Sequence, residues 1–215
     1  ETAQDAAVCA ERAGLSIAVI DAIPFALYNC VRFNYASDEG CTMVLDIGAR
    51  STNLVFVEGS KIFTRSIPVA GNTIANEIAR SLSVSAQEAE QIKKEIGFVA
   101  LGGTYAVVDD ELADKVSKVV RNVVTRLHSE VTRSINFYRS QQGGSAPTRL
   151  LLSGGASLTR HMDSFFREKL GCEVEYLNPF ANVAVVDSIR DNTEDLFLMA
   201  PLVGLALRSR LKCPV

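Results

Sequence analysis

Short apolar runs bounded by turn residues recur along the chain and predict β-strands. They fall at residues 16–21, 42–48, 52–58, 61–70, 148–157 and 173–179. The sequence EGSK, which joins the third run to the fourth, is typical of a hairpin turn. The three central runs are therefore expected to form an antiparallel meander.

Longer segments with apolar residues three and four positions apart predict helices. They fall at residues 2–13, 24–36, 72–82, 85–97, 111–141, 158–171 and 197–208. Local signals support several ends: Pro24 suits a first helical turn, Ser85 is followed by Glu88 in a capping-box pattern, and Gly14 and Gly97 are typical stops. Because strands alternate with helices after the first hairpin, the predicted fold class is α/β.

The composition is that of an ordinary globular protein, with 215 residues, 47% apolar and 22% charged. A net charge of −3 without a long run of one sign argues against a nucleic-acid-binding protein. No apolar run approaches the ~20 residues that a membrane helix needs. The five scattered cysteines include no CxxC pair, and His128 and His161 lack a second ligand at metal spacing. We therefore expect free thiols in a reducing compartment, without disulfides or a zinc site.

The first candidate for chemistry is the sequence LDIGARSTNL, where polar residues interrupt two apolar runs. A phosphate chain needs backbone N–H donors that it can approach closely, and Gly48 has no Cβ to prevent this. Ser51, Thr52 and Asn53 add side-chain donors, and Asp46 can hold a water or a hydrated Mg²⁺. The alternative interpretation is an ordinary polar hairpin turn.

Two further pieces are weak signals by themselves. The sequence LLLSGGAS places Gly154 and Gly155 at the end of a strand, where the backbone can lie flat against a planar ring. A helix that starts near Leu158 would add the partial positive charge of its N-terminus. Glu90 and Lys93 share one helical face, where a carboxylate and an ammonium can hold two ribose hydroxyls. The alternatives are a strand-to-helix turn and a solvated ion pair.

The order of these pieces resembles the second lobe of the actin-like ATPase superfamily. Within it, the chain resembles the FtsA group and especially the PilM family of type IV pilus assembly proteins, over nearly its whole length. VIDAIPFALYNC is similar to the segment that connects the two lobes, and LLLSGGASLTRHMDSFFREKLGCEVEYLNPF to the adenosine motif with its helix and strand. The resemblance implies an actin-like, ribonuclease H-like fold: a mixed sheet with a three-stranded antiparallel meander flanked by helices.

The resemblance also implies a domain division and a set of ligand contacts. Residues 1–37 would be a remnant of the first lobe with the connecting segment, 38–83 and 141–215 the core of the second lobe, and 84–140 a smaller helical inserted subdomain. The implied cofactors of the full-length protein are ATP and Mg²⁺, with Asp46 holding the metal through water. The implied contacts are Asp46, Gly48, Ser51, Thr52 and Asn53 for phosphate, Glu90 and Lys93 for ribose, and Gly154, Gly155, Ala156 and Ser157 for adenosine.

Two departures from the family count against simple ATPase activity. The family has another phosphate loop in its first lobe, which this sequence does not show; together with a start that reads as the middle of a helix, this indicates a fragment lacking most of that lobe. Relatives such as FtsA and MreB carry a Glu just before the connecting Pro, where this chain has Ile23. Asp21, two residues earlier on the same face of a predicted strand, and Asp46 remain the catalytic candidates. Losing a water-orienting acid costs ~10²–10⁴-fold in rate.

The implied function is a cytoplasmic ATP-binding scaffold at the inner face of the inner membrane, in a type IV pilus assembly platform, with little hydrolysis. A PilN-like inner-membrane protein would bind through the missing first lobe, so membrane contact would be indirect. The alternatives are an active ATPase or phosphotransferase of the same superfamily and an FtsA-like cell-division filament protein. Apolar residues of the orphaned first-lobe helices, around Phe25, Leu27 and Phe33, are expected to be exposed and to favour a homodimer.

Overall fold

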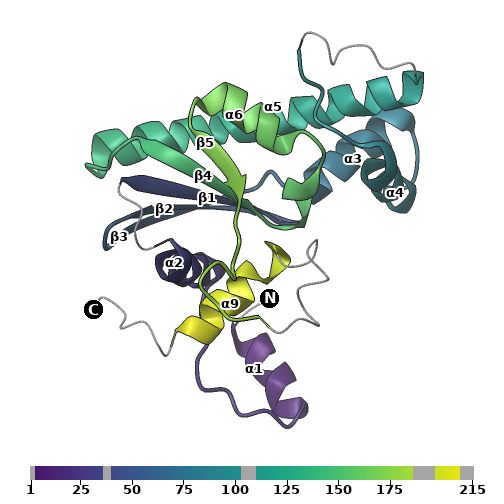
Figure 1. Cartoon of the computed structure of the whole chain (residues 1–215). Coiled ribbons are helices and arrows are strands. Elements are labelled where there is room, and N and C mark those ends of the chain that lie inside the picture. Colours follow the sequence, from purple (N-terminus) through teal and green to yellow (C-terminus); the bar gives the residue numbers. More distant parts are fainter. Residues whose placement is uncertain (1–2, 36–39, 103–109, 186–196, 209–215) are drawn as a thin grey trace.

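The computed structural model describes residues 3–35, 40–102, 110–185 and 197–208. Figure 1 shows a sheet with helices on both faces, as expected for an α/β fold. The five strands run in the spatial order β3-β2-β1-β4-β5. The predicted domain boundary between residues 37 and 38 lies outside the described residues. The division of the chain into three parts stays a prediction.

The predicted antiparallel meander is confirmed. It consists of β1 (Cys41–Ile47), β2 (Thr52–Glu58) and β3 (Lys61–Ile67), with Glu58 opposite Lys61 at the hairpin turn. The strands β4 (Pro147–Ser153) and β5 (Glu173–Tyr176) add to the other side of β1 in parallel. Because β1 and β4 are parallel, the loops that follow them leave from the same edge of the sheet.

Each of the seven predicted helical segments contains a helix. The helices are α1 (Ala3–Arg12), α2 (Ile23–Asn34), α3 (Gly71–Leu82), α4 (Ala86–Ile96), α5 (Glu111–Gln141), α6 (Met162–Leu170) and α9 (Ala200–Leu207), with short 3₁₀ turns η2 (Gly155–Leu158) and η3 (Phe197–Met199). Ser85 caps α4 as predicted, its Oγ accepting from the Glu88 N–H at 3.2 Å. Asp110 caps α5 in the same way, accepting from the Leu112 N–H at 2.9 Å.

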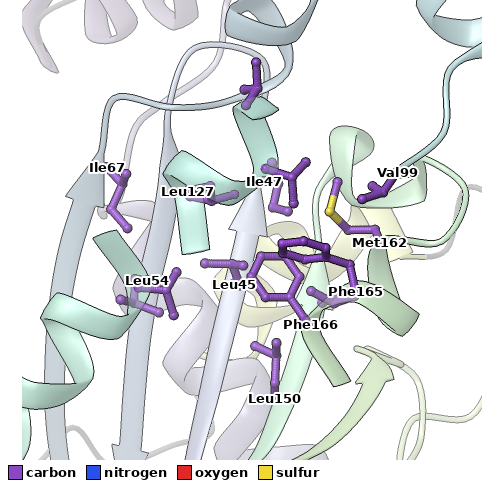
Figure 2. Packing of buried hydrophobic residues seen from close by; sticks show 14 of the residues in the cluster. Leu45, Ile47, Leu54, Ile67, Val99, Leu127, Leu150, Met162, Phe165 and Phe166 are labelled. Carbon is purple, nitrogen blue, oxygen red and sulfur yellow. The ribbon is translucent and has the colours of Figure 1, made fainter. Parts of the chain in front are cut away.

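The two faces of the sheet are covered by different helices. Met43, Leu45 and Ile47 of β1 belong to a cluster with α5 and α6, and Figure 2 shows Phe165 and Phe166 of α6 beside this strand. Val44 faces the other way, into a cluster with α2 and α9. All seven residues of β1 are therefore buried, which explains its continuous apolar sequence.

Three local predictions are wrong. Residues 16–21 form no strand, and Ile17, Val19 and Ile20 are exposed, because an apolar run becomes a strand only beside a hydrogen-bonding neighbour. Leu27 is fully buried in the cluster under the sheet, so it contributes nothing to an exposed face. The α-helix after the double glycine begins at Met162 and not near Leu158, because η2 intervenes. Among the helices of the described residues, none combines the length and apolarity needed to cross a membrane.

Candidate functional site

A pocket of about 740 Å³ lies at the edge where β1 and β4 end. Four separate segments line it: the turn after β1, the start of α3, one face of α4 with the residues that follow it, and the loop after β4. In sheets of this kind, ligands bind in the crevice beyond the carboxyl ends of parallel strands. Five of the residues singled out from the sequence line this pocket: Gly48, Glu90, Lys93, Gly155 and Ala156.

The turn after β1 is closed by its own backbone. The Gly48 N–H donates to the Ser51 carbonyl at 3.1 Å, and a Cβ on Gly48 would lie 3.0 Å from that oxygen. The fully buried Thr52 donates its hydroxyl to the Val69 carbonyl at 2.6 Å. Thr52 therefore joins β2 to the segment that leads into α3, and its hydroxyl is committed inside the protein.

Asp46 lies under the loops at the end of β1 and is only 7% exposed. Its Oδ2 accepts from the Asn53 side chain at 3.0 Å, across the β1–β2 pair. Burial raises the pKa of Asp46, while hydrogen bonds from Asn53 and Ser153 act in the opposite direction. The oxygens of a buried carboxylate with these neutral partners are suitable ligands for a water or a hydrated hard cation.

Gly154 covers Asp46 and is required by geometry. Its φ is +82°, and a Cβ there would lie 2.6 Å from the Ile47 carbonyl oxygen and 2.8 Å from Asp46 Oδ1. Ser157 is fully buried and donates its hydroxyl back to the Gly154 carbonyl at 2.6 Å. Gly155, between them in the loop, is exposed to the pocket. The two glycines therefore have different roles: Gly154 allows close packing on Asp46, and Gly155 leaves open space in the pocket.

Glu90 and Lys93 form more than a solvated pair. Lys93 Nζ donates to Glu90 Oε2 at 2.6 Å and to the Gly71 carbonyl at 3.4 Å. The Lys93 side chain is 12% exposed, whereas the neighbouring Lys94 side chain is 72% exposed. The pair is therefore built into the wall of the pocket and connects α4 to the start of α3.

One wall of the pocket, formed by the segment after α4 and the loop after η2, was not predicted from the sequence. The segment after α4 pairs with the loop after η2 through a bridge between Phe98 and Arg160, and the Val99 N–H donates to the Arg160 carbonyl at 2.9 Å. The Arg160 guanidinium lies 5.6 Å from the centre of the Phe98 ring. Arg121 of α5 donates to the Ala100 carbonyl and holds the same segment from behind. No local pattern could have paired segments this far apart.

Asp21 and Ile23, the two positions before and at the start of α2 that were considered for catalysis, lie apart from this arrangement. Asp21 forms an ion pair with Arg208 at the end of α9, and its Oδ1 accepts from the Ala22 N–H at 2.8 Å. Its side chain is 6% exposed. Ile23 opens α2 and is half exposed, and neither residue lines the pocket. Because the segment before α2 is not a strand, the expected shared face of Asp21 and Ile23 does not exist.

Comparisons with known proteins identify a matching family and a set of related proteins. The family described as "Type IV pilus assembly protein PilM" matches residues 1–210. The chain is similar to the cell division protein FtsA of Agrobacterium fabrum, with 30% identity over 164 residues, which cover 70% of this chain and 37% of that protein. The chain thus spans well under half the length of this curated relative.

Solved structures extend the likeness to the fold. A PilM–PilN type IV pilus biogenesis complex superimposes with a TM-score of 0.77 and 31% identity, covering 98% of this chain and 58% of that chain. MreB5 of Spiroplasma citri bound to ADP superimposes with a TM-score of 0.67 and 16% identity, covering 96% of this chain and 64% of that chain. The predicted actin-like fold is confirmed.

Proposed function

The chain belongs to the PilM family of type IV pilus assembly proteins, and from this premise we propose that it carries one half of an ATP site in an actin-like scaffold protein. One observation carries the proposal: the turn after β1, the Glu90–Lys93 pair and the double-glycine loop, which are far apart in the sequence, line a single pocket. Its volume of about 740 Å³ is in the usual range of small-molecule sites.

The proposed contacts follow the chemistry of each wall. Backbone N–H groups of the turn after Gly48 would donate to phosphate oxygens, and the adjacent start of α3 would add the partial positive charge of a helix N-terminus. Glu90 and Lys93 would hold the ribose hydroxyls, and Gly155 and Ala156 would lie against the adenosine. When bound, Mg²⁺ would neutralise phosphate charge, with Asp46 holding it through water.

The remaining predicted residues would act indirectly. Thr52 and Ser157 donate their hydroxyls to backbone carbonyls, and Asn53 donates its amide to Asp46. In the proposed site they hold the phosphate and adenosine loops in place, while Ser51, which is half-buried in the turn, keeps its assignment as a phosphate contact. Gly154 lets the adenosine loop pack on Asp46.

We propose that the protein turns ATP over slowly. The family position for a water-orienting acid is Ile23, and the nearby Asp21 is committed to Arg208. A nucleotide that is bound without rapid hydrolysis acts as a ligand that selects one conformation of a protein. Such a protein would serve as a cytoplasmic scaffold at the inner face of the inner membrane, with a PilN-like partner engaged outside this chain's pocket.

The test is calorimetric titration of Mg-ATP into the chain and two variants. Gly155→Val adds bulk inside the pocket, while among the described residues its Cβ would meet only Leu198, at an ordinary 3.8 Å. Gly102→Val makes the same change where none of the described residues lies within 4 Å. We expect micromolar binding by the unmodified chain and by Gly102→Val, and at least a tenfold loss for Gly155→Val, about 1.4 kcal/mol. Equal affinity in all three, or no binding by the unmodified chain, would refute this use of the pocket.

Two further measurements separate the alternative functions. Phosphate release from bound ATP at rates of ordinary enzymes, ~1 s⁻¹ or faster, would favour an active ATPase over a scaffold. Sedimentation with and without ATP would detect the filaments expected of an FtsA-like protein. The predicted homodimer is checked by light scattering, and a clean monomer at every concentration would contradict it.

A further inference from the structure

Gly71, the first residue of α3, is a junction between three walls of the pocket. Its N–H donates to the Gly48 carbonyl at 2.9 Å, and the next N–H, of Asn72, donates to the Ala49 carbonyl at 2.8 Å. A Cβ on Gly71 would lie 3.2 Å from the Cβ of Ala156. The position of the turn after β1 is therefore tied to the position of this helix start.

The Gly71 carbonyl is in turn tied to α4 through Lys93. The Lys93 ammonium donates to that carbonyl at 3.4 Å and to Glu90 at 2.6 Å. An ammonium has three donors, so one remains beyond these two hydrogen bonds. The Lys93 carbonyl accepts from the Gly97 N–H at 3.1 Å, where the wall containing Phe98 begins.

We infer that Lys93 is a positioning residue for the phosphate-binding turn, in addition to any contact with ribose. The chain of contacts runs from Lys93 through Gly71 to Gly48 and Ala49. Backbone N–H groups bind phosphate well only when they are held at their final geometry before the ligand arrives. This inference rests on the proposed function, because it concerns the same pocket.

Removing the ammonium should disturb this link without unfolding the protein. The helices α3 and α4 remain joined to the core by apolar residues, including the buried Ile74, Ile78 and Ala89. Lys93→Met keeps the length of the side chain and removes its donors. Lys94→Met is the matched comparison, because it removes the same charge from the next residue, whose ammonium lies 3.7 Å from Glu90 Oε1.

The first measurement compares ATP with 2′,3′-dideoxy-ATP in calorimetric titrations. If Lys93 only contacts ribose hydroxyls, Lys93→Met weakens ATP binding and leaves dideoxy-ATP binding unchanged. If Lys93 positions the phosphate turn, the variant weakens both nucleotides by a similar factor, which we expect to be at least tenfold. An unchanged affinity for dideoxy-ATP would overturn the inference.

The second measurement needs no ligand. Amide hydrogen exchange of Gly71 and Asn72, followed by NMR, reports the two hydrogen bonds to the turn. We expect exchange at both amides to accelerate at least fivefold in Lys93→Met and to stay unchanged in Lys94→Met. Unchanged exchange in Lys93→Met overturns the inference. If the unmodified chain binds no ATP, the proposed function fails, and hydrogen exchange alone decides the role of Lys93.

Discussion

The sharpest structural prediction concerns Gly154, whose replacement by alanine should destabilise the protein severely. Its backbone has φ +82° and ψ 152°, a region that is essentially restricted to glycine and costs about 1–3 kcal/mol for other residues. A Cβ would also lie 2.6 Å from the Ile47 carbonyl oxygen and 2.7 Å from its carbon, which are backbone atoms that cannot move aside cheaply. Overpacking of this kind adds about 1–3 kcal/mol.

The two contributions together predict a loss of about 2–6 kcal/mol, against the 5–15 kcal/mol that is typical of a whole domain. Urea unfolding followed by circular dichroism measures the free energy of unfolding. Two further glycines separate the causes. Gly59→Ala places an alanine at φ +58° where no atom of the residues that the structure describes lies within 4 Å, so it should lose only about 1–2 kcal/mol. Gly102→Ala, without a positive φ or close atoms from the described part of the chain, should change stability by less than about 0.5 kcal/mol.

Only one ordering of the three variants agrees with the close approach between the loop after β4 and the end of β1. Gly154→Ala must lose more stability than Gly59→Ala, because it combines backbone strain with a steric clash. A loss for Gly154→Ala equal to that of Gly59→Ala would mean that the Cβ has room. A loss near zero would mean that Gly154 does not hold the described conformation, and the geometry deduced around Asp46 would then be refuted.

Three other predictions address the same neighbourhood and the far face of the sheet. Thr52→Val should cost about 1–3 kcal/mol in urea unfolding, because it leaves the Val69 carbonyl without its donor, whereas Thr52→Ser should recover part of the loss; equal losses would contradict this role of the hydroxyl. Burial raises the pKa of Asp46, so the folded state holds this proton more tightly than the unfolded state does, and the group lowers stability as pH rises from its unfolded pKa through its folded pKa. Asp46→Asn should therefore gain stability relative to the unmodified protein between pH 3.5 and pH 7, and a flat difference across that range would count against the shift. A Cβ on Gly204 of α9 would lie 1.8 Å from the Ala26 carbonyl oxygen of α2, so Gly204→Ala should lose at least about 2 kcal/mol, and a neutral result would show that the two helices are farther apart.

Much of the fold could be read from local patterns. The meander of β1 to β3, the 31-residue helix α5 and the Ser85 cap are encoded within short stretches, because apolar periodicity and turn residues act over one element at a time. The strand prediction that failed depends on contacts between segments. Residues 16–21 have a strand-like composition but no neighbouring strand among the described residues, and pairing is a property of two segments.

In the candidate site, too, the local sequence predicted the residue types, while contacts between segments decided their roles. The sequence singled out the polar interruption after β1, the Glu90–Lys93 pair and the double glycine, but not which members face the pocket. Thr52 and Ser157 have the same chemistry as phosphate donors, yet both are fully buried and donate to backbone carbonyls. Alternation along β1 places Asp46 on the face opposite Leu45 and Ile47, and Asp46 is not among the residues that line the pocket.

The sequence by itself determined most of the elements, the fold class and the residue types that the site contains, because these depend on neighbours along the chain. Only the tertiary structure decided that Lys93 reaches Gly71, that Gly154 must pack on Asp46, and that Phe98 pairs with Arg160. Each of these contacts joins segments that fold separately and meet when the helices pack at the edge of the sheet. Their geometry comes from steric fit and hydrogen bonding between distant segments, which no periodicity within a single segment records.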